Sequence, residues 1–353
     1  MNRSVMNRQR LEEILNRFPK LRIAVVGDFF LDKWLEIDRG LDEPSLETGL
    51  IAYQVVAKRC YAGAAGTVLS NLSALEVGKL YAIGFRGDDG EGFEMDRILR
   101  GLGVDTGRLV TSGDVMTPTY TKPVFRRGNG LEETNRLDHK NIRPTPAALE
   151  QKIIDSIWNI VPDVDAVIAL DQLTSEGYGV LTPRVRQELA RLGGQYPDLV
   201  LYADSRAFIK QFQNMIIKCN NIEALRLFDA SGAAGIEEKA SNLEEVKKCL
   251  LKLAAAASRP VFITCGSRGV MVPGKDGPVL VPGVSLPPGT PIDIVGAGDA
   301  CSSGIVTALC AGATPEEAAL TGNLVAANTI QVIGTTGTAT RDQVLGIFDK
   351  YFH

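Results

Sequence analysis

The sequence is poor in the residues that zinc sites and disulfide frameworks need. It has only two histidines, one of them at the last position, and its six cysteines are dispersed in apolar surroundings without a C-x-x-C pair. A zinc centre and a disulfide-stapled secreted domain are therefore not expected, and a reducing cytoplasm fits best. No run of about eighteen apolar residues occurs, so no membrane span is expected. The first residues, MNRSVMNRQRLEEILNRF, carry charges throughout and predict a surface helix rather than a signal peptide.

The sequence also lacks an excess of charge of one sign. Its net charge is −4, and its lysines and arginines are scattered. Nucleic-acid binding is not expected, because such surfaces need a basic stripe. A small anion is not excluded, since a few amides and one or two cations can hold a phosphate. With 353 residues, 45% of them apolar and 23% charged, the composition is that of an ordinary globular protein.

Apolar stretches of strand length alternate with helix-length amphipathic stretches. This alternation predicts an α/β fold, in which a mostly parallel sheet carries helices on both faces. Ligands bind beyond the carboxyl ends of such strands, where this sequence places Asp28, Asp171, Asp204 and Gly266. The expected strands are 21–28, 79–89, 164–171, 198–204, 214–221 and 259–266, and the expected helices include 65–76, 92–103 and 243–257.

Two stretches, 33–60 and 117–138, break this alternation. They are rich in Thr, Tyr and Val, and the second contains RRGNG, which is typical of a hairpin. They predict a small second sheet inserted into a single α/β domain that spans residues 1–353. Such a sheet would have one unpaired apolar face, so we expect it to cover a cleft or a partner subunit.

The most informative stretch is PIDIVGAGDACSSGI, residues 291–305. IDIV reads as a strand, and a glycine turn then leads into a helix. Amides at a helix N-terminus suit an anion, and glycine lets it approach closely. Asp299 would repel a phosphate, but it could take a proton from a hydroxyl that attacks one. It could equally be a helix N-cap. A dinucleotide fingerprint fits less well because Cys301 replaces its third glycine, and no P-loop pattern occurs.

DIVGAGDACSSGIVTALCAG resembles the C-terminal signature of the ribokinase-like (PfkB) carbohydrate kinases. The resemblance extends over about residues 20–345 and is closest to the kinase part of the bacterial heptose-phosphate kinases. VVGDFFLDKW and YAGAAGTVLSNLSALE are similar to two N-terminal motifs of that subfamily, and NRLDHK, NNIE and GTTGTAT follow in the same order. No adenylyltransferase segment follows, so the likeness is to the kinase half alone.

The resemblance implies roles in phosphoryl transfer and in binding the acceptor. Asp299 would be the catalytic base, and the amides of Gly296, Ala297 and Gly298 would form an anion hole. Asp32, and with it Asp28, would accept hydrogen bonds from sugar hydroxyls, while a loop residue exposed to solvent is the alternative for Asp28. Gly63 would let the sugar approach the backbone. Three arginines would suit a phosphorylated sugar or would be solvated strand-edge charges: Arg126, Arg127 and Arg136.

The resemblance also implies that the cofactors are ATP and Mg²⁺. Asn220 and Glu223 would position Mg²⁺ through water, or would form a capping pair at the next helix. The segment TCGSRGV would border the nucleotide, or would be a plain hairpin turn; it includes Thr264, Gly266 and Gly269. Asn328 and residues 334–338 would lie on the adenine side. Asp293 lies where some family members bind a monovalent cation such as K⁺.

Departures from the family pattern concentrate on the sugar side. Ala62 and Gly66 replace a glycine and an asparagine, Thr174 stands where a lysine is expected, and D-P-K becomes Asp204-Ser205-Arg206. The expectation is an ATP-dependent kinase of a sugar or sugar phosphate, a homodimer through the small sheet. A nucleoside kinase and a non-catalytic sugar or nucleotide sensor are the alternatives, and a dehydrogenase is a third.

Overall fold

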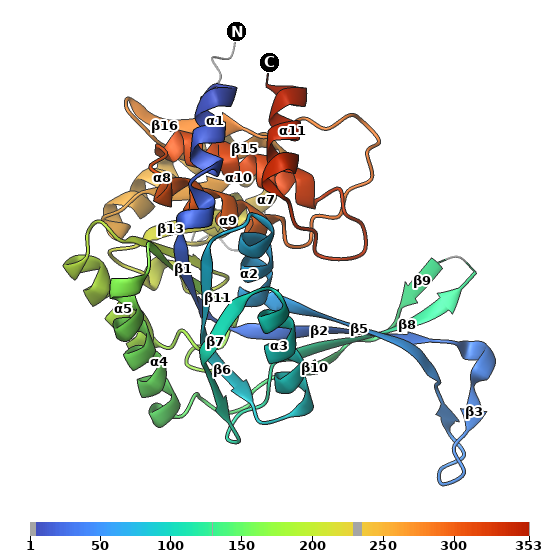
Figure 1. Ribbon diagram of the computed structural model, residues 1–353. Coiled ribbons are helices and arrows are strands. Elements are labelled where there is room, and N and C mark those ends of the chain that lie inside the picture. Colours follow the sequence, from blue (N-terminus) through green and yellow to red (C-terminus); the bar gives the residue numbers. More distant parts are fainter. Residues whose placement is uncertain (1–4, 129, 229–234, 353) are drawn as a thin grey trace.

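The computed structural model describes residues 5–128, 130–228 and 235–352 and is organised around a nine-stranded sheet (Figure 1). Seven neighbouring strands run parallel, in the order β14 (Val261–Thr264), β13 (Ile216–Asn220), β12 (Val200–Ser205), β11 (Ala166–Asp171), β1 (Arg22–Gly27), β6 (Lys79–Gly87) and β7 (Val104–Ser112). An antiparallel pair, β15 (Gly269–Gly274) and β16 (Gly277–Pro282), extends the edge at β14. The predicted α/β class and mostly parallel sheet are confirmed.

Helices cover both faces because side chains of each buried strand alternate between two cores. Ile23 and Val25 face one core, with α1 (Arg8–Leu15), α2 (Ala65–Ala74), α3 (Gly90–Gly101), α9 (Ala297–Cys310), α10 (Pro315–Thr329) and α11 (Arg341–Tyr351). Ala24 and Val26 face the other, with α4 (Ala147–Ile160), α5 (Pro183–Gln195), α6 (Asn221–Arg226), α7 (Ile236–Ser241) and α8 (Leu243–Ala257). The predicted N-terminal surface helix is α1, which buries Leu11, Ile14 and Leu15 in the first core.

The small second sheet is also confirmed, and we call it the lid sheet. Its order is β10 (Leu137–His139), β8 (Thr119–Arg127), β2 (Phe29–Ile37) and β5 (Val55–Ala64), with β9 (Gly130–Glu133) paired to β8. Strands β2 and β8 are parallel, and the other pairs are antiparallel. The RRGNG turn joins β8 to β9, although residue 129 lies outside the described residues. Strands β2 to β5 extend from Phe29 to Ala64, beyond both ends of the predicted 33–60. Strands β8 to β10 extend from Thr119 to His139, so they begin later and end later than the predicted 117–138.

The lid sheet projects from the body as an arm (Figure 1). At its tip, η2 (Arg39–Leu41) precedes a short pair, β3 (Glu43–Pro44) and β4 (Ile51–Ala52). Only Asp28 separates β1 from β2, so the arm starts at the carboxyl end of a central strand. The chain's other short 3-10 helices are η1 (Phe18–Lys20), η3 (Val161–Asp163), η4 (Ile209–Gln211) and η5 (Gly266–Arg268). None of the helices described here has the length and apolar character of a membrane span.

One predicted strand is wrong. Residues 292–295, IDIV, form a loop without ladder pairing, and three of their side chains are exposed to solvent: Ile292 (51%), Ile294 (72%) and Val295 (63%). The apolar run therefore does not enter the core. It approaches the glycine turn from outside the sheet, beside the entrance to the site described next.

Candidate active site

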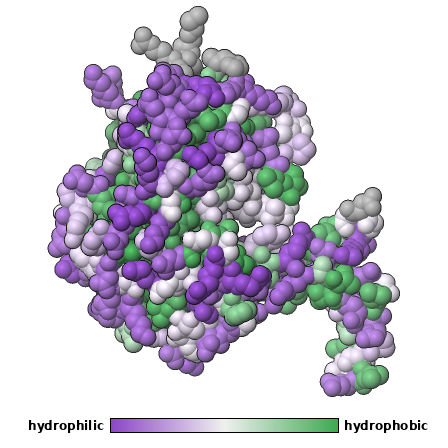
Figure 2. Space-filling model, viewed as in Figure 1, coloured by the Kyte–Doolittle hydropathy of each residue, from purple (hydrophilic) through white to green (hydrophobic). Residues whose placement is uncertain are grey.

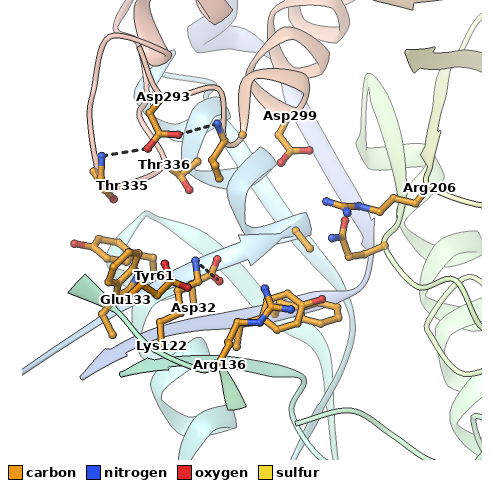
Figure 3. Close-up of a pocket in the computed structure, with 18 residues that line it drawn as sticks. Asp32, Tyr61, Lys122, Glu133, Arg136, Arg206, Asp293, Asp299, Thr335 and Thr336 are labelled. Atoms are coloured by element: carbon orange, nitrogen blue, oxygen red, sulfur yellow. Dashed lines mark hydrogen bonds and ion pairs between the residues drawn. The ribbon is translucent and has the colours of Figure 1, made fainter. Parts of the chain in front are cut away.

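A cavity of about 400 Å³ lies between the lid sheet and the carboxyl edge of the large sheet (Figure 3). The lid sheet supplies one wall. Gln172 and Arg206, which directly follow β11 and β12, supply the second. The third wall comes from the glycine turn, with Gly296 and Asp299, and from Gly334–Thr336 beside it. The cavity thus lies where parallel sheets bind ligands.

The glycine turn places Asp299 in the first turn of α9, pointing into the cavity (Figure 3). Gly296 is the N-cap, with φ 80° and ψ 0°, and no side chain caps this helix. Asp299 is the third residue of the helix, so the N-cap alternative for Asp299 is wrong. A Cβ at Gly296 would lie 2.4 Å from Cγ2 of Thr336, so both its backbone conformation and its surroundings require glycine.

The amides of this turn offer one free donor fewer than the three that were predicted. Ala297 N donates to the carbonyl of Ile294 at 3.2 Å, so this amide is already engaged within the turn. Across the described residues, the amides of Gly296 and Gly298 have no acceptor. These two amides and the positive end of the helix dipole remain for an anion.

Asp299 sits in an environment that favours its protonated form. Burial raises the pKa of this carboxyl to about 7, and the negative charge of Asp204 adds to the effect. Lys218 and Arg206 act in the opposite direction. No hydrogen bond joins the Asp299 carboxylate to any described residue, and the side chain faces the cavity. A carboxylate with a pKa near neutrality can both accept and release a proton.

A buried ion pair lies directly behind this turn. Lys218 on β13 is buried, and its Nζ donates to Asp204 Oδ2 at 2.7 Å. Burial alone would lower the pKa of Lys218, but the Asp204 carboxylate raises it above its ordinary value. A Cβ at Gly298 would lie 3.0 Å from the same Nζ, so the ammonium packs against the turn. Ser302 of α9 also donates to Asp204 Oδ2, at 3.2 Å.

The lid wall is aromatic and cationic. Every second residue of β2 lines the cavity, namely Phe30, Asp32 and Trp34, as do Tyr120 and Lys122 on β8. A period of two puts such residues on one face of a sheet. The alternation is visible in the sequence. It identifies these five residues as one wall only when the parallel pairing of β2 with β8 is also known.

Asp32 and Arg136, both predicted to bind the acceptor, are brought together on this wall. Burial raises the pKa of Asp32, while Lys122 and Arg136 oppose the change; Lys122 Nζ lies 3.9 Å from Asp32 Oδ1. The Arg136 guanidinium stacks 4.1 Å from the centre of the Tyr120 ring. The other two arginines of the predicted cluster do not reach the cavity, because they form ion pairs on the arm: Arg126 with Glu36 and Arg127 with Glu132.

Two predicted acceptor residues have other roles. Asp28 is 3% exposed and lies outside the cavity, so both the predicted sugar contact and the solvated-loop alternative are wrong. Its oxygens accept hydrogen bonds from the amides of Gln172 (3.0 Å) and Val180 (2.8 Å), which fixes the loop after β11. Gly63 does not line the cavity either. A Cβ there would lie 2.5 Å from Asp32 Oδ2, so this glycine makes room for the Asp32 carboxylate.

The residues predicted on the nucleotide side lie outside this cavity, on the neighbouring strands. Asn220 and Glu223 form a capping box at α6, as the alternative stated. Thr264 ends β14, Gly266 begins η5 in the hairpin to β15, and Gly269 begins β15. A Cβ at Gly269 would lie 2.1 Å from the Val281 carbonyl, so this glycine is needed for strand packing.

Asn328 and Asp293 also have structural hydrogen bonds. The Asn328 amide donates to the Leu324 and Gln343 carbonyls within the helical layer. Asp293 lines the cavity, and its two oxygens accept from the amides of Val295 and Gly334, each at 3.1 Å. Asp293 thereby ties the loop before the glycine turn to residues 334–336. No sequence pattern indicates Lys218, which is a single lysine in a mostly apolar strand.

Comparisons with known proteins give matches over most of the chain. The profile of the pfkB family carbohydrate kinases matches residues 22–341. Bifunctional protein HldE of Desulfatibacillum aliphaticivorans is 28% identical over 331 residues, which are 92% of this chain and 62% of that protein. HldE of Citrifermentans bemidjiense is 26% identical over 340 residues, 96% of this chain and 66% of that protein. The chain therefore spans slightly less than two thirds of these relatives.

Solved structures show the same fold. Arabidopsis thaliana ribokinase complexed with ribose and ATP superposes with a TM-score of 0.65 at 18% identity, covering 93% of this chain and 98% of that one. Phosphofructokinase-2 of Escherichia coli in complex with fructose-6-phosphate gives 0.64 at 14% identity, covering 94% and 100%. With the family profile spanning most of its length, the chain belongs to the pfkB family of carbohydrate kinases, which are phosphotransferases with an alcohol group as acceptor.

Proposed function

We propose that this protein is an ATP-dependent kinase of a sugar phosphate and that Asp299 is its general base. The observation that carries the proposal is the Asp299 carboxylate, which faces the cavity, has no hydrogen-bond partner among the described residues and has a pKa raised to about 7. In the reaction the acceptor hydroxyl gives its proton to Asp299, and its oxygen bonds to the γ-phosphorus. The bond from that phosphorus to the bridging oxygen breaks, and ADP leaves.

The turn before Asp299 would stabilise the transferring group. The Gly296 and Gly298 amides point out of the N-terminus of α9, where an anion is favoured. The Lys218 ammonium lies directly behind Gly298, which adds positive charge without exposing it to water. Because these donors are held by the fold, they need little reorganisation when charge develops on the phosphoryl oxygens.

The residues present fit a Mg²⁺ ion that arrives with the nucleotide. Asn220 and Glu223 present oxygen atoms, which Mg²⁺ prefers. The capping box engages the single side-chain oxygen of Asn220 and one carboxylate oxygen of Glu223, so the second Glu223 oxygen is left for the water shell of the ion. Burial raises the pKa of Glu223, and the negative charge of Asp204 adds to this effect. A nearby dication would therefore stabilise the ionised forms of both carboxyl groups. We infer that they hold the ion through water, where it would neutralise charge on the phosphates of ATP.

The acceptor side supports a phosphorylated sugar. Lys122, Arg136 and Arg206 line the cavity, and guanidinium and ammonium groups are the usual partners of a phosphate. Trp34 and Tyr120 offer flat faces to a sugar ring, and Asp32 offers a carboxylate to its hydroxyls. A nucleoside would need only the aromatic faces and would offer no phosphate to Lys122 and Arg206, whereas Arg136 already forms an ion pair with Asp138.

ADP formation tests the proposal directly. Wild-type protein is incubated with ATP and Mg²⁺ and a panel of free sugars, sugar phosphates and nucleosides, with Asp299→Asn as the matched inactive control. Turnover confined to sugar phosphates is expected. Turnover of nucleosides would support the nucleoside kinase instead. If ligands raise the melting temperature but none is phosphorylated, the protein is a sensor and the proposed function is wrong.

The loop held by Asp293 is the proposed monovalent-cation site. Its two carboxylate oxygens are engaged by backbone amides, so the loop's carbonyl groups and not the carboxylate alone would coordinate the ion. Comparing turnover in K⁺ with turnover in Na⁺ at equal ionic strength checks this; equal rates would exclude it.

We also propose that the arm joins two copies of the chain. Its tip and β5 expose apolar side chains to solvent: Leu41, Leu46, Leu50, Ile51, Tyr53 and Val55 (Figure 2). Water contact with such a patch is unfavourable, and a second arm is self-complementary to it. Sedimentation equilibrium should give a dimer for wild type and for the control Leu251→Glu on α8, but a monomer for Leu50→Glu.

A further inference from the structure

A buried ionic cluster lies beneath the second wall of the cavity and has no part in the chemistry above. Asp171 and Ser205, the last residues of β11 and β12, are paired in register, and they are 4% and 1% exposed. Ser205 Oγ donates to Asp171 Oδ2 at 2.8 Å. Arg186 of α5, 3% exposed, brings its Nη1 to 3.5 Å from the same oxygen.

Arg186 is held tightly in this cluster. Its Nη2 donates to Glu176 Oε1 at 2.6 Å, and the guanidinium lies 4.8 Å from the centre of the Phe208 ring. Its Nε is buried without a hydrogen-bond partner. It is the one fully buried arginine in the part of the chain that the structure describes. An apolar side chain of similar size is often at least as stable at such a position, so stability alone does not account for the guanidinium.

The cluster controls the backbone of the two wall residues. Arg206 N donates to the Asp171 carbonyl at 3.1 Å, and Phe208 N donates to Ser205 Oγ at 2.9 Å, so the start of the loop after β12 is fixed on both sides. On the other strand, Glu176 belongs to the loop that begins at Gln172. Arg186 therefore contacts the end of β11 through Nη1 and the loop after β11 through Nη2, and it contacts the loop after β12 through the ring of Phe208.

We propose that Arg186 is a positioning residue for the acceptor. It acts through Asp171, Ser205 and Glu176 to hold Arg206 and Gln172 against the cavity, although it does not touch the cavity itself. Figure 3 shows Arg206 reaching in from this wall on the side of Asp299. The inference rests on the proposed function, because it assigns these wall residues to the acceptor.

A double-mutant cycle tests this role. Arg186→Met should raise the KM for the best sugar-phosphate acceptor about tenfold, the range expected when a charge-assisted hydrogen bond is lost, and should change kcat and the KM for ATP little. Arg206→Gln should have a similar effect. If Arg186 acts through Arg206, the double variant should be no worse than Arg206→Gln alone. If the effects of the two substitutions on the KM multiply in the double variant, or if Arg186→Met leaves the KM unchanged, the proposal is wrong.

Controls separate positioning from loss of folding. Arg191→Met makes the same substitution on the same helix, where the side chain is 59% exposed and pairs with Glu188; it should leave the KM unchanged. Should Arg186→Met not fold, Ser205→Ala removes only the hydroxyl that Asp171 and Phe208 N share, and it should give the same KM pattern. An unchanged KM in Ser205→Ala would then overturn the proposal.

A crystal structure of Arg186→Met gives a reading that does not depend on turnover. Displacement of Arg206 and of residues 172–180 relative to wild type is expected. An unchanged wall would refute the positioning role even in an active kinase. If wild type phosphorylates no acceptor, the proposed function is wrong. The crystal structure would still show whether Arg186 determines the position of the wall.

Discussion

The ionisation of Asp299 should control both the rate and the stability of this protein. In the folded chain its pKa is raised from 3.8 to about 7. The native state therefore binds a proton more tightly than the unfolded state between these values. Stability must fall as the pH rises through this window, because the charged carboxylate is disfavoured in the fold. The loss in free energy of unfolding caused by ionised Asp299 is complete above about pH 7 and disappears below about pH 4.

The size of the effect follows from the two pKa values. At about 1.4 kcal/mol per pH unit, the difference between 3.8 and about 7 corresponds to about 4 kcal/mol. Water in the open cavity screens the charge, so we expect about 1–2 kcal/mol. Asp299→Asn removes the charge and should therefore be more stable than wild type at pH 8, by about 1–3 °C in Tm for a chain of 353 residues. At pH 5 the difference should be about a third as large, because pH 5 lies only about 1.2 units above the unfolded-state pKa of 3.8.

Thermal unfolding at pH 5 and pH 8 measures this, with Asp276→Asn in the exposed turn between β15 and β16 as the control. In parallel, kcat/KM of wild type should fall about tenfold between pH 8 and pH 6, since only the ionised base is active. Asp299→Asn should lose about three orders of magnitude in turnover. A variant that is less stable than wild type at pH 8, or a rate independent of pH across this range, would refute the reasoning.

Three further variants address the rest of the site. Gly296→Ala should lose about 1–2 kcal/mol and most of its turnover, because φ is +80° and the new Cβ meets a threonine methyl; Gly289→Ala has the same φ but open space around it and is the control in unfolding and rate assays. Lys218→Met should lose about 3–5 kcal/mol in denaturant unfolding, since its carboxylate partner remains buried. It should also move the acidic limb of the rate profile to higher pH, because Lys218 lowers the pKa of Asp299. Asp32→Asn should raise the KM for the acceptor but not for ATP; equal effects on both would exclude a contact with the acceptor alone.

Regular structure was largely predictable from the sequence because it depends on local patterns. Buried parallel strands are continuous apolar runs, and the helices between them carry caps and a period near 3.6. The lid sheet was predictable because its two stretches are rich in Thr, Tyr and Val and lack the helical period. The rule that an apolar run forms a buried strand failed at IDIV, where three apolar side chains are exposed on a loop. Nothing in four residues distinguishes an apolar loop from a short strand.

The chemistry of the site was predictable only in part. A glycine turn that leads into a helix with an early aspartate specifies a donor-lined helix end and a nearby base, because both lie within seven residues of one another. The alternatives at Asn220 and Glu223 could not be separated, since the same two side chains can cap a helix and bind an ion through water. The fold shows the cap.

By itself the sequence determined the family, the alternation of elements and the position of Asp299 at the start of α9. Only the tertiary structure decided which charges meet: that Asp28 lies outside the cavity whereas Asp32 lines it, that Lys218 lies behind the turn, and that Arg186 lies beneath the wall. The reason is physical. Local periodicity fixes which face of a strand is apolar, whereas the distance between two strand ends depends on strand order, which is set by packing across the whole sheet.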